Sequence, residues 1–383
     1  MLHERKAGSM KHTPPSKVER SSVRVDPARV QTTALVIIAF AVVLFLLVQA
    51  RFLLISLATA IILFSLTSDV INFIARQRIG PVRIPNWLAS LAAVLLIAAA
   101  LITLTSILVA QLNTVLVTTL AYAERAPDAI AALFGWAGAD VEEAVRNSVA
   151  SIELSGYLRG AAGGATSMTQ ASVLVILFVG FLFVERVWFQ TKLSNFIGDP
   201  EQARRVGRII GSIIHRVNYY LLVKTGISLV TGAMTYVLAR AFGLEIALPL
   251  GVITFVLNFI PNVGSIIATG LVALAAYIQL GDPWYTTVIF AVAGTIQFVN
   301  GSIIDPMLMG RALRLSSFGI LLSLAFWGAV WGIPGMFLSV PIMVMLLVVC
   351  SHVEALRPVA ILLSREGLPE DDGELPPSRA PRP

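Results

Sequence analysis

Long apolar runs, separated by short polar stretches, dominate the chain. A helix that crosses the hydrocarbon core of a bilayer needs about 20 apolar residues, and the runs 33–66 and 315–351 are each long enough for two crossings. We therefore predict an all-α polytopic membrane protein with about eight transmembrane helices plus broken or re-entrant hairpins. Proline interrupts the runs 246–280 and 317–350 near their middle, so the count is eight if these are hairpins and ten if every run crosses.

The charges between the apolar runs predict the orientation of the chain. Loops rich in Lys and Arg stay on the cytoplasmic side of a membrane, and the basic stretches are residues 1–32 and the loop 188–218. The segment 113–170 is acidic, which predicts a location outside, and its apolar residues from Val141 to Ile152 recur at helical spacing, as in an amphipathic helix. An even number of crossings leaves both termini in the cytoplasm.

These patterns divide the chain into five parts. The parts are a disordered basic cytoplasmic tail (1–32), the first membrane helices (33–112), an extracytoplasmic amphipathic helical segment (113–170), the main membrane domain (171–350) with its cytoplasmic loop 188–218, and a disordered Pro-rich cytoplasmic tail (351–383). We expect the main membrane domain to carry any solute path.

The composition excludes several classes of protein. Only 13% of the residues are charged and the mean hydropathy is +0.83, against roughly 25% charged residues in a soluble domain. The net charge of +6 comes from flanks and loops, so we expect the lipid bilayer, and no nucleic acid, as a partner. The single Cys350, the absence of a Gly-Lys pair and four His confined to tails, loops or helix boundaries predict no disulfide, no P-loop and no zinc site. We expect no cofactor, no metal and no enzymatic activity.

The first candidate site is a break between two apolar runs, at residues 258–265 (NFIPNVGS). Proline removes a backbone donor and glycine permits a turn, so this stretch is expected to unwind. Unwound backbone at membrane depth is tolerated beside protein or a water-filled cavity, and transporters place solute and ion sites at such breaks. The alternative is an ordinary tight turn at the cytoplasmic surface. The candidate path residues here are Asn258, Pro261, Asn262, Gly264 and Ser265.

The second candidate site is a polar helical face that leads from Gln297 and Asn300 to Asp305. A carboxylate at membrane depth is unfavourable unless it binds an ion, takes a proton or pairs with a base. Arg311 and Arg314 follow closely and are the expected bases. The alternative is a salt bridge at the cytoplasmic end that holds the next loop. The candidate path residues here are Gln297, Asn300, Ser302, Asp305 and Pro306.

Two further features fall near helix ends. Lys224 lies one turn inside its apolar run, where we expect it to pair with Glu185 or to neutralise an anionic solute, and interface anchoring is the alternative. Gly332, Pro334 and Gly335 interrupt the last apolar stretch. They predict either a structural hairpin or a hinge or gate.

The order of these motifs resembles the autoinducer-2 exporter family. The segments that carry the resemblance are 258–265, the block Asp305-Pro306-Met307-Leu308-Met309-Gly310-Arg311 and the stretch from Trp327 to Pro341. The resemblance implies a bacterial inner-membrane, exporter-like protein with roughly eight spans, assembled as a homo-oligomer. The family includes proteins linked to the quorum-sensing signal autoinducer-2 and others linked to sodium or proton exchange.

Three functions follow as hypotheses. The first is a secondary transporter that exports a small polar metabolite, with autoinducer-2 as one candidate and Asp305 as the coupling group. The second is a cation and proton antiporter that uses the same residues and needs no organic solute. The third is a membrane scaffold whose outer segment 113–170 binds a partner.

Overall fold

The computed structural model describes residues 27–76, 86–122, 128, 131, 138–150, 154–309, 315–365 and 367. The chain divides into two compact units, residues 1–46 and 47–383. In its described residues the first unit is most of one apolar helix, α1 (Pro27–Gln49). The prediction of a disordered tail over residues 1–32 is wrong from Pro27 onward, where α1 begins, and residues 1–26 lie outside the described part of the chain.

Apolar helices make up the described chain, which confirms the predicted all-α polytopic membrane protein. Within the described residues, seven helical stretches are long and apolar enough to cross a membrane, namely those of α1, α3 (Asn86–Tyr122), α6 (Leu154–Glu185), α8 (Pro200–Ala241), α10 (Val263–Leu280), α11 (Pro283–Val299) and α14 (Ile333–His352). Three helices carry shorter apolar stretches: α2 (Arg51–Arg76), α9 (Ala247–Leu257) and α13 (Ser317–Trp331). The 11 residues of α9 extend only about 16 Å, too short to cross a hydrocarbon core of about 30 Å alone.

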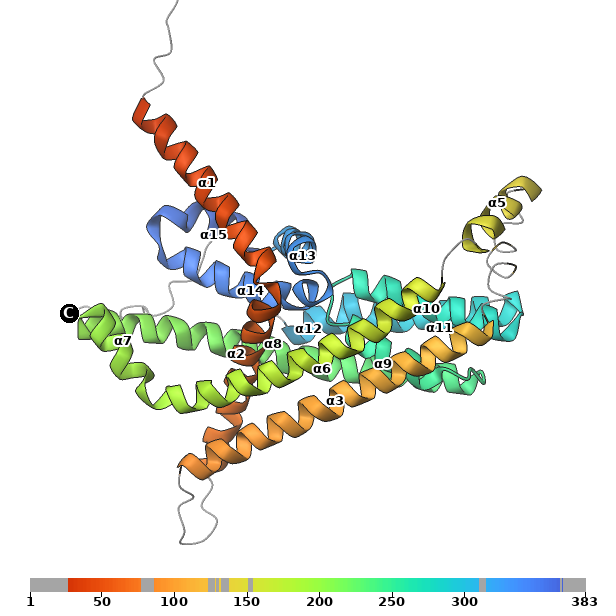
Figure 1. Ribbon diagram of the computed structural model, residues 1–383, viewed down its shortest axis with the longest axis horizontal. Helices are drawn as coiled ribbons and strands as arrows, with labels where there is room; N and C mark the ends of the chain where they lie inside the picture. The colour runs from red at the N-terminus through yellow and green to blue at the C-terminus, as the bar shows by residue number, and fades with distance from the viewer. Residues whose placement is uncertain are drawn as a thin grey trace, which may run out of the picture. The chain divides into compact units, whose positions relative to one another are not determined.

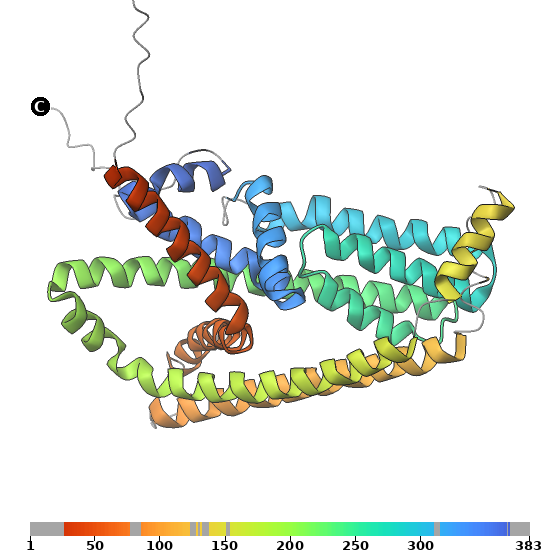
Figure 2. The ribbon, with the colours of Figure 1, turned by 45° about the horizontal axis from the view of Figure 1, so that its top comes forward.

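Helices α2, α3 and α6 form one packed group within the second unit. Figures 1 and 2 show α3 and α6 running side by side, and Ala60 of α2 is buried with apolar residues of both. The ring of Phe64 meets Phe183 edge to face, with 4.8 Å between centroids. With 37 and 32 residues, α3 and α6 extend about 55 and 48 Å, so both are longer than a bilayer core requires.

Helices α8 to α11 form a second group. Ala239, Leu250, Val272 and Ile289 bring one buried apolar residue from each of the four helices to a common core. Helices α8 and α9 approach closely because small residues face each other there, as is common between membrane helices. A Cβ atom on Gly232 would lie 2.7 Å from the carbonyl oxygen of Gly251.

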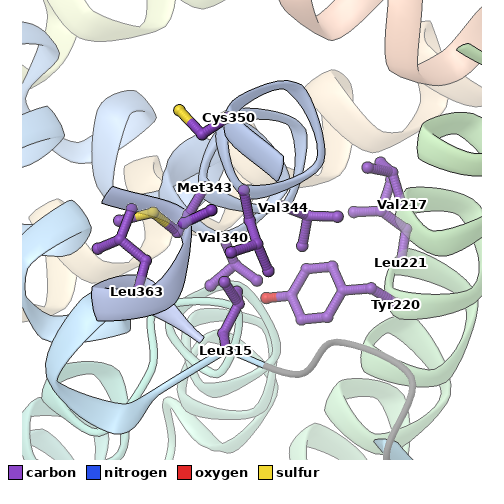
Figure 3. Packing of buried hydrophobic residues seen from close by; sticks show 11 residues of the cluster. Val217, Tyr220, Leu221, Leu315, Val340, Met343, Val344, Cys350 and Leu363 are labelled. Carbon is purple, nitrogen blue, oxygen red and sulfur yellow. The ribbon is translucent and has the colours of Figure 1, made fainter. Parts of the chain in front are cut away.

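Helices α8, α14 and α15 (Arg357–Leu363) share a third core. Tyr220 and Leu221 of α8 contact Val340, Val344 and other residues of α14 there (Figure 3). Ala360 and Leu363 of α15 are buried in the same core. The prediction of a disordered tail from residue 351 is therefore wrong as far as Leu363, because these apolar side chains anchor the segment. Residues from 368 onward lie outside the described part.

The predicted loop 188–218 is also helical. A short 3-10 turn, η2 (Arg186–Trp188), follows α6 and leads into α7 (Phe189–Ile197). Helix α8 begins at Pro200 within this stretch because Asp199 caps it, its carboxylate accepting a hydrogen bond from the Glu201 amide at 2.8 Å. In the segment 113–170, the described residues are helical: the end of α3, α5 (Ala139–Ala150) and the start of α6.

Two tight turns close the hairpins α9–α10 and α13–α14. A Cβ atom on Gly264 would lie 1.8 Å from the Leu257 carbonyl oxygen, and one on Gly335 would lie 2.0 Å from the Trp327 carbonyl oxygen. Each turn also contains a positive φ, of 59° at Asn262 and 66° at Gly332, a conformation that L-residues with a Cβ rarely adopt. Both breaks predicted from Pro and Gly are therefore real turns.

Candidate transport site

Four buried polar side chains lie on one face of α8: Lys224, Ser228, Thr231 and Thr235. Their spacing of four, three and four residues places them in one row. Thr231 and Thr235 donate to carbonyl oxygens one turn back, at 2.8 and 3.0 Å. This row, the α8 polar row, runs along the helix that packs against α9, α11 and α12 (Asp305–Met309).

Lys224 and Asp305 form a buried ion pair at one end of the row. The Nζ atom of Lys224 lies 2.6 Å from Oδ2 of Asp305, and the two side chains are 5% and 20% exposed. The pair joins α8 to α12 across 81 residues of chain. Either charge alone would be strongly unfavourable in the protein interior, so each group stabilises the charged form of the other.

Two asparagines predicted as path residues contact the same row. Nδ2 of Asn258, at the end of α9, donates to Oγ of Ser228 at 3.1 Å. Nδ2 of Asn300 donates to Oγ1 of Thr231 at 2.7 Å. Both candidate sites are therefore hydrogen-bonded to the α8 polar row, the first through Asn258 and the second through Asn300.

A π-helical turn, η3 (Asn300–Ile304), connects α11 to Asp305. Such turns insert an extra residue into the helical repeat and often occur at functional sites. Across this stretch the predicted polar face divides between two neighbours. Asn300 and Asp305 bond to α8, whereas Gln297 and Ser302 line a groove on α10 and α11. In the structure these side chains do not all contact the same neighbour, and the path that they were predicted to line stays a prediction.

The groove has a volume of about 350 Å³. Four predicted path residues line the groove: Asn262, Ser265, Gln297 and Ser302. Thr269 and two phenylalanines line it as well. Its lining contains hydroxyl, amide and aromatic groups and no charge. Oε1 of Gln297 is buried and has no hydrogen-bond partner among the described residues, which is unusual for a polar atom in a folded protein. Gln297 therefore lines the groove and carries one buried acceptor atom that no described residue satisfies.

The remaining candidates have other neighbours. Glu185 forms an ion pair with Lys192 on α7, the helix that follows η2. It does not pair with Lys224, whose partner is Asp305. Arg311 and Arg314 lie outside the described residues. Pro261 and Gly264 belong to the α9–α10 turn, Pro306 lies in the first turn of α12, and Gly332, Pro334 and Gly335 form the α13–α14 turn.

Sequence reasoning missed the polar residues of α8 beyond Lys224. Ser228, Thr231 and Thr235 stand in an apolar run, where a hydroxyl can bond the preceding turn and so passes as neutral. Their helical spacing with Lys224 was the signal that could have identified the row. Tyr220, one turn before Lys224, has a buried hydroxyl without a partner among the described residues.

Broken helices, a polar groove and a buried ion pair within an apolar helical protein are the features of a membrane transporter. The family model described as AI-2E family transporter matches residues 35–355. The chain therefore belongs to the AI-2E transporter family, which confirms the resemblance seen in the motifs. The names of the family and of its members are those of transporters and not of enzymes.

Several curated proteins are similar to the chain. A putative transport protein of Borreliella burgdorferi is 31% identical over 228 residues, or 58% of this chain and 62% of the relative. The AI-2 transport protein TqsA of Escherichia coli K12 is 32% identical over 192 residues, or 50% and 54%. A putative transport protein of Haemophilus influenzae is 35% identical over 170 residues, or 44% and 49%. The chain thus spans about half to three fifths of the length of these relatives.

Proposed function

We propose that the protein is a secondary transporter that exports a small polar metabolite. The observation that carries this proposal is the groove on α10 and α11, which begins at the Asn262 turn and is lined by the hydroxyl and amide side chains of Ser265, Thr269, Gln297 and Ser302. Broken helices are where secondary transporters bind solutes, because unwound backbone and polar side chains there replace water. The volume of about 350 Å³ suits a small molecule.

The candidate substrate is autoinducer-2. The relative TqsA carries the name AI-2 transport protein, and the uncharged, hydrogen-bonding lining of the groove suits a small polar solute. On the charge pattern of the loops and the family resemblance, we place the protein in the inner membrane of a bacterium, with both termini cytoplasmic and as a homo-oligomer.

The solute path can be tested with Gln297→Leu, which keeps the side-chain volume and removes the amide. We expect efflux of autoinducer-2 from loaded proteoliposomes to fall about tenfold, since one lost hydrogen bond is worth about 1 kcal/mol or slightly more. Thr295→Val is the matched control, because Thr295 is exposed on the same helix and does not line the groove. Equal efflux by Gln297→Leu and Thr295→Val would contradict a solute path along the groove. If wild-type efflux is no faster than leakage from protein-free liposomes, autoinducer-2 is excluded as the substrate.

The coupling role of Asp305 predicts a separate result. Asp305→Asn keeps the shape of the side chain but can neither carry a charge nor exchange a proton. We expect the acceleration of efflux by an imposed pH gradient to disappear in this variant, while Glu185→Gln, an acid-to-amide change in an exposed pair, keeps it. Unchanged proton dependence in Asp305→Asn would remove Asp305 from the coupling role.

A second candidate function is cation and proton antiport. The buried Lys224–Asp305 pair favours it, since intramembrane acid and base pairs often mark ion or proton pathways. This function predicts that sodium, potassium or lithium added to proteoliposomes without organic solute changes their internal pH. Export of a metabolite predicts no such change under the same conditions.

A further inference from the structure

The segment that links α6 to α8 is named here the elbow and comprises residues 186–208. It begins directly after α6, and the helical stretch that is apolar enough to cross a membrane runs from Thr166 through α7 to Ile197. Because the basic residues begin at Arg186, we expect the elbow at an edge of the membrane. Its next turn, at Gly198 with a φ of 75° and the Asp199 cap, directs the chain into α8.

One face of α7 packs on α8, and another presents exposed aromatic side chains on either side of Lys192, which pairs with Glu185. Gln190 and Leu193 lie against Gly207 of α8. Phe189, Lys192 and Phe196 share another face at helical spacing, and Phe196 is 90% exposed. Trp188, just before α7, is 60% exposed. Aromatic side chains presented in this way beside a transmembrane helix are typical of the interface between lipid headgroups and acyl chains.

Basic side chains lie at the start of α8, the helix against which α7 packs. Arg204, Arg205 and Arg208 line a depression of about 570 Å³ at the start of α8, together with Asp199, Glu201 and Gln202. One oxygen of the Asp199 carboxylate accepts a hydrogen bond from the Glu201 amide, and Nε of Arg204 donates to the Pro200 carbonyl oxygen. Within the described chain these three arginines form no salt bridge. Three arginines and two carboxylates give the lining of the depression a net charge of +1.

We propose that the elbow binds the headgroups of acidic phospholipids, with Phe189 and Phe196 inserted at the interface and Arg204, Arg205 and Arg208 on the phosphate groups. Arginine suits this task because its planar guanidinium donates two parallel hydrogen bonds to a phosphate. Basic residues near an acidic membrane surface contribute about fivefold each to binding. The aromatic side chains and the arginines both bind lipid only when the elbow lies at the edge of the membrane. The two kinds of contact therefore add to the same binding.

The test is native mass spectrometry of the purified full-length protein in detergent with equal amounts of phosphatidylglycerol and phosphatidylcholine. We expect wild type to retain phosphatidylglycerol preferentially. In the variant Arg204→Gln/Arg205→Gln/Arg208→Gln this preference is expected to fall at least about tenfold. The corresponding triple Lys variant keeps the charges but loses the parallel hydrogen bonds, and is expected to show an intermediate preference. Arg240→Gln, at the opposite end of α8, is the matched control and should behave as wild type.

Two additional measurements separate the contributions. Phe189→Ser/Phe196→Ser is expected to lower the retention of both lipids while the ratio between them stays above one. Inorganic phosphate at the same concentration should leave bound phosphatidylglycerol in place, because it lacks acyl chains to occupy the interface. The proposal is overturned by equal retention of the two lipids in wild type, by an unchanged preference in the triple Gln variant, or by displacement with inorganic phosphate.

Discussion

Gly264→Ala is expected to prevent the α9–α10 hairpin from closing and to abolish the folded protein. The added Cβ would lie 1.8 Å from the Leu257 carbonyl oxygen, a distance that real atoms do not reach, so the turn must open. The turn also positions Asn258 against Ser228 and Asn262 in the groove. We expect a loss of more than about 4 kcal/mol in the free energy of unfolding, visible as little or no monodisperse protein after purification.

The control for this change is Gly270→Ala in the middle of α10. No atom lies within 4 Å of a Cβ placed there, and alanine favours a helix over glycine by about 1 kcal/mol. The melting temperature in detergent should therefore stay the same or rise. A Gly264→Ala protein whose melting temperature falls by less than about 2 °C would show that the turn is not as tight as described.

Removal of either charge of the Lys224–Asp305 pair is expected to destabilise the protein more than removal of both. Lys224→Met leaves a buried carboxylate without its partner, and Asp305→Asn leaves a buried ammonium. Each single change should reduce the free energy of unfolding by about 3–5 kcal/mol. The double variant should be more stable than either single one, because it contains no unpaired charge. Unfolding by SDS titration of all four proteins gives the coupling between the two residues.

The exposed pair Glu185–Lys192 is the matched control for this cycle. Its side chains are 51% and 63% exposed, so water solvates each charge when the other is removed. We expect Glu185→Gln and Lys192→Met to change stability by less than about 1 kcal/mol each, with little coupling between them. Additive single changes at Lys224 and Asp305 would contradict a buried, interdependent pair.

The class of fold could be predicted from the sequence because it depends on local properties. Apolar runs of sufficient length can satisfy their backbone in lipid only as helices, and the turns at Gly264 and Gly335 arise from steric limits that Pro and Gly reveal directly. Helix α15 could not be predicted in this way. Its order depends on the burial of Ala360 and Leu363 against residues of α8 and α14, which no local pattern encodes.

The candidate site was predicted only in part, for a similar reason. Asn258, Asn300 and Asp305 were found because polar residues in apolar surroundings are conspicuous. Their partner helix was not found, since Lys224 is separated from Asp305 by 81 residues and only tertiary packing brings them together. Gln297 and Asp305 also have different neighbours, and the π-helical turn at Asn300–Ile304 lies between them. A regular helical repeat applied to the sequence does not include that turn.

Helix α8 has a mechanical consequence. Its 42 residues form a rod of about 63 Å, roughly twice the hydrocarbon thickness of a bilayer, and proline occurs only in its first turn. Because no proline in the interior of the rod concentrates bending, a sideways displacement of the arginine-rich end would be carried along the rod as a tilt. That tilt would shift Ser228 and Thr231 against Asn258 and Asn300, their hydrogen-bond partners.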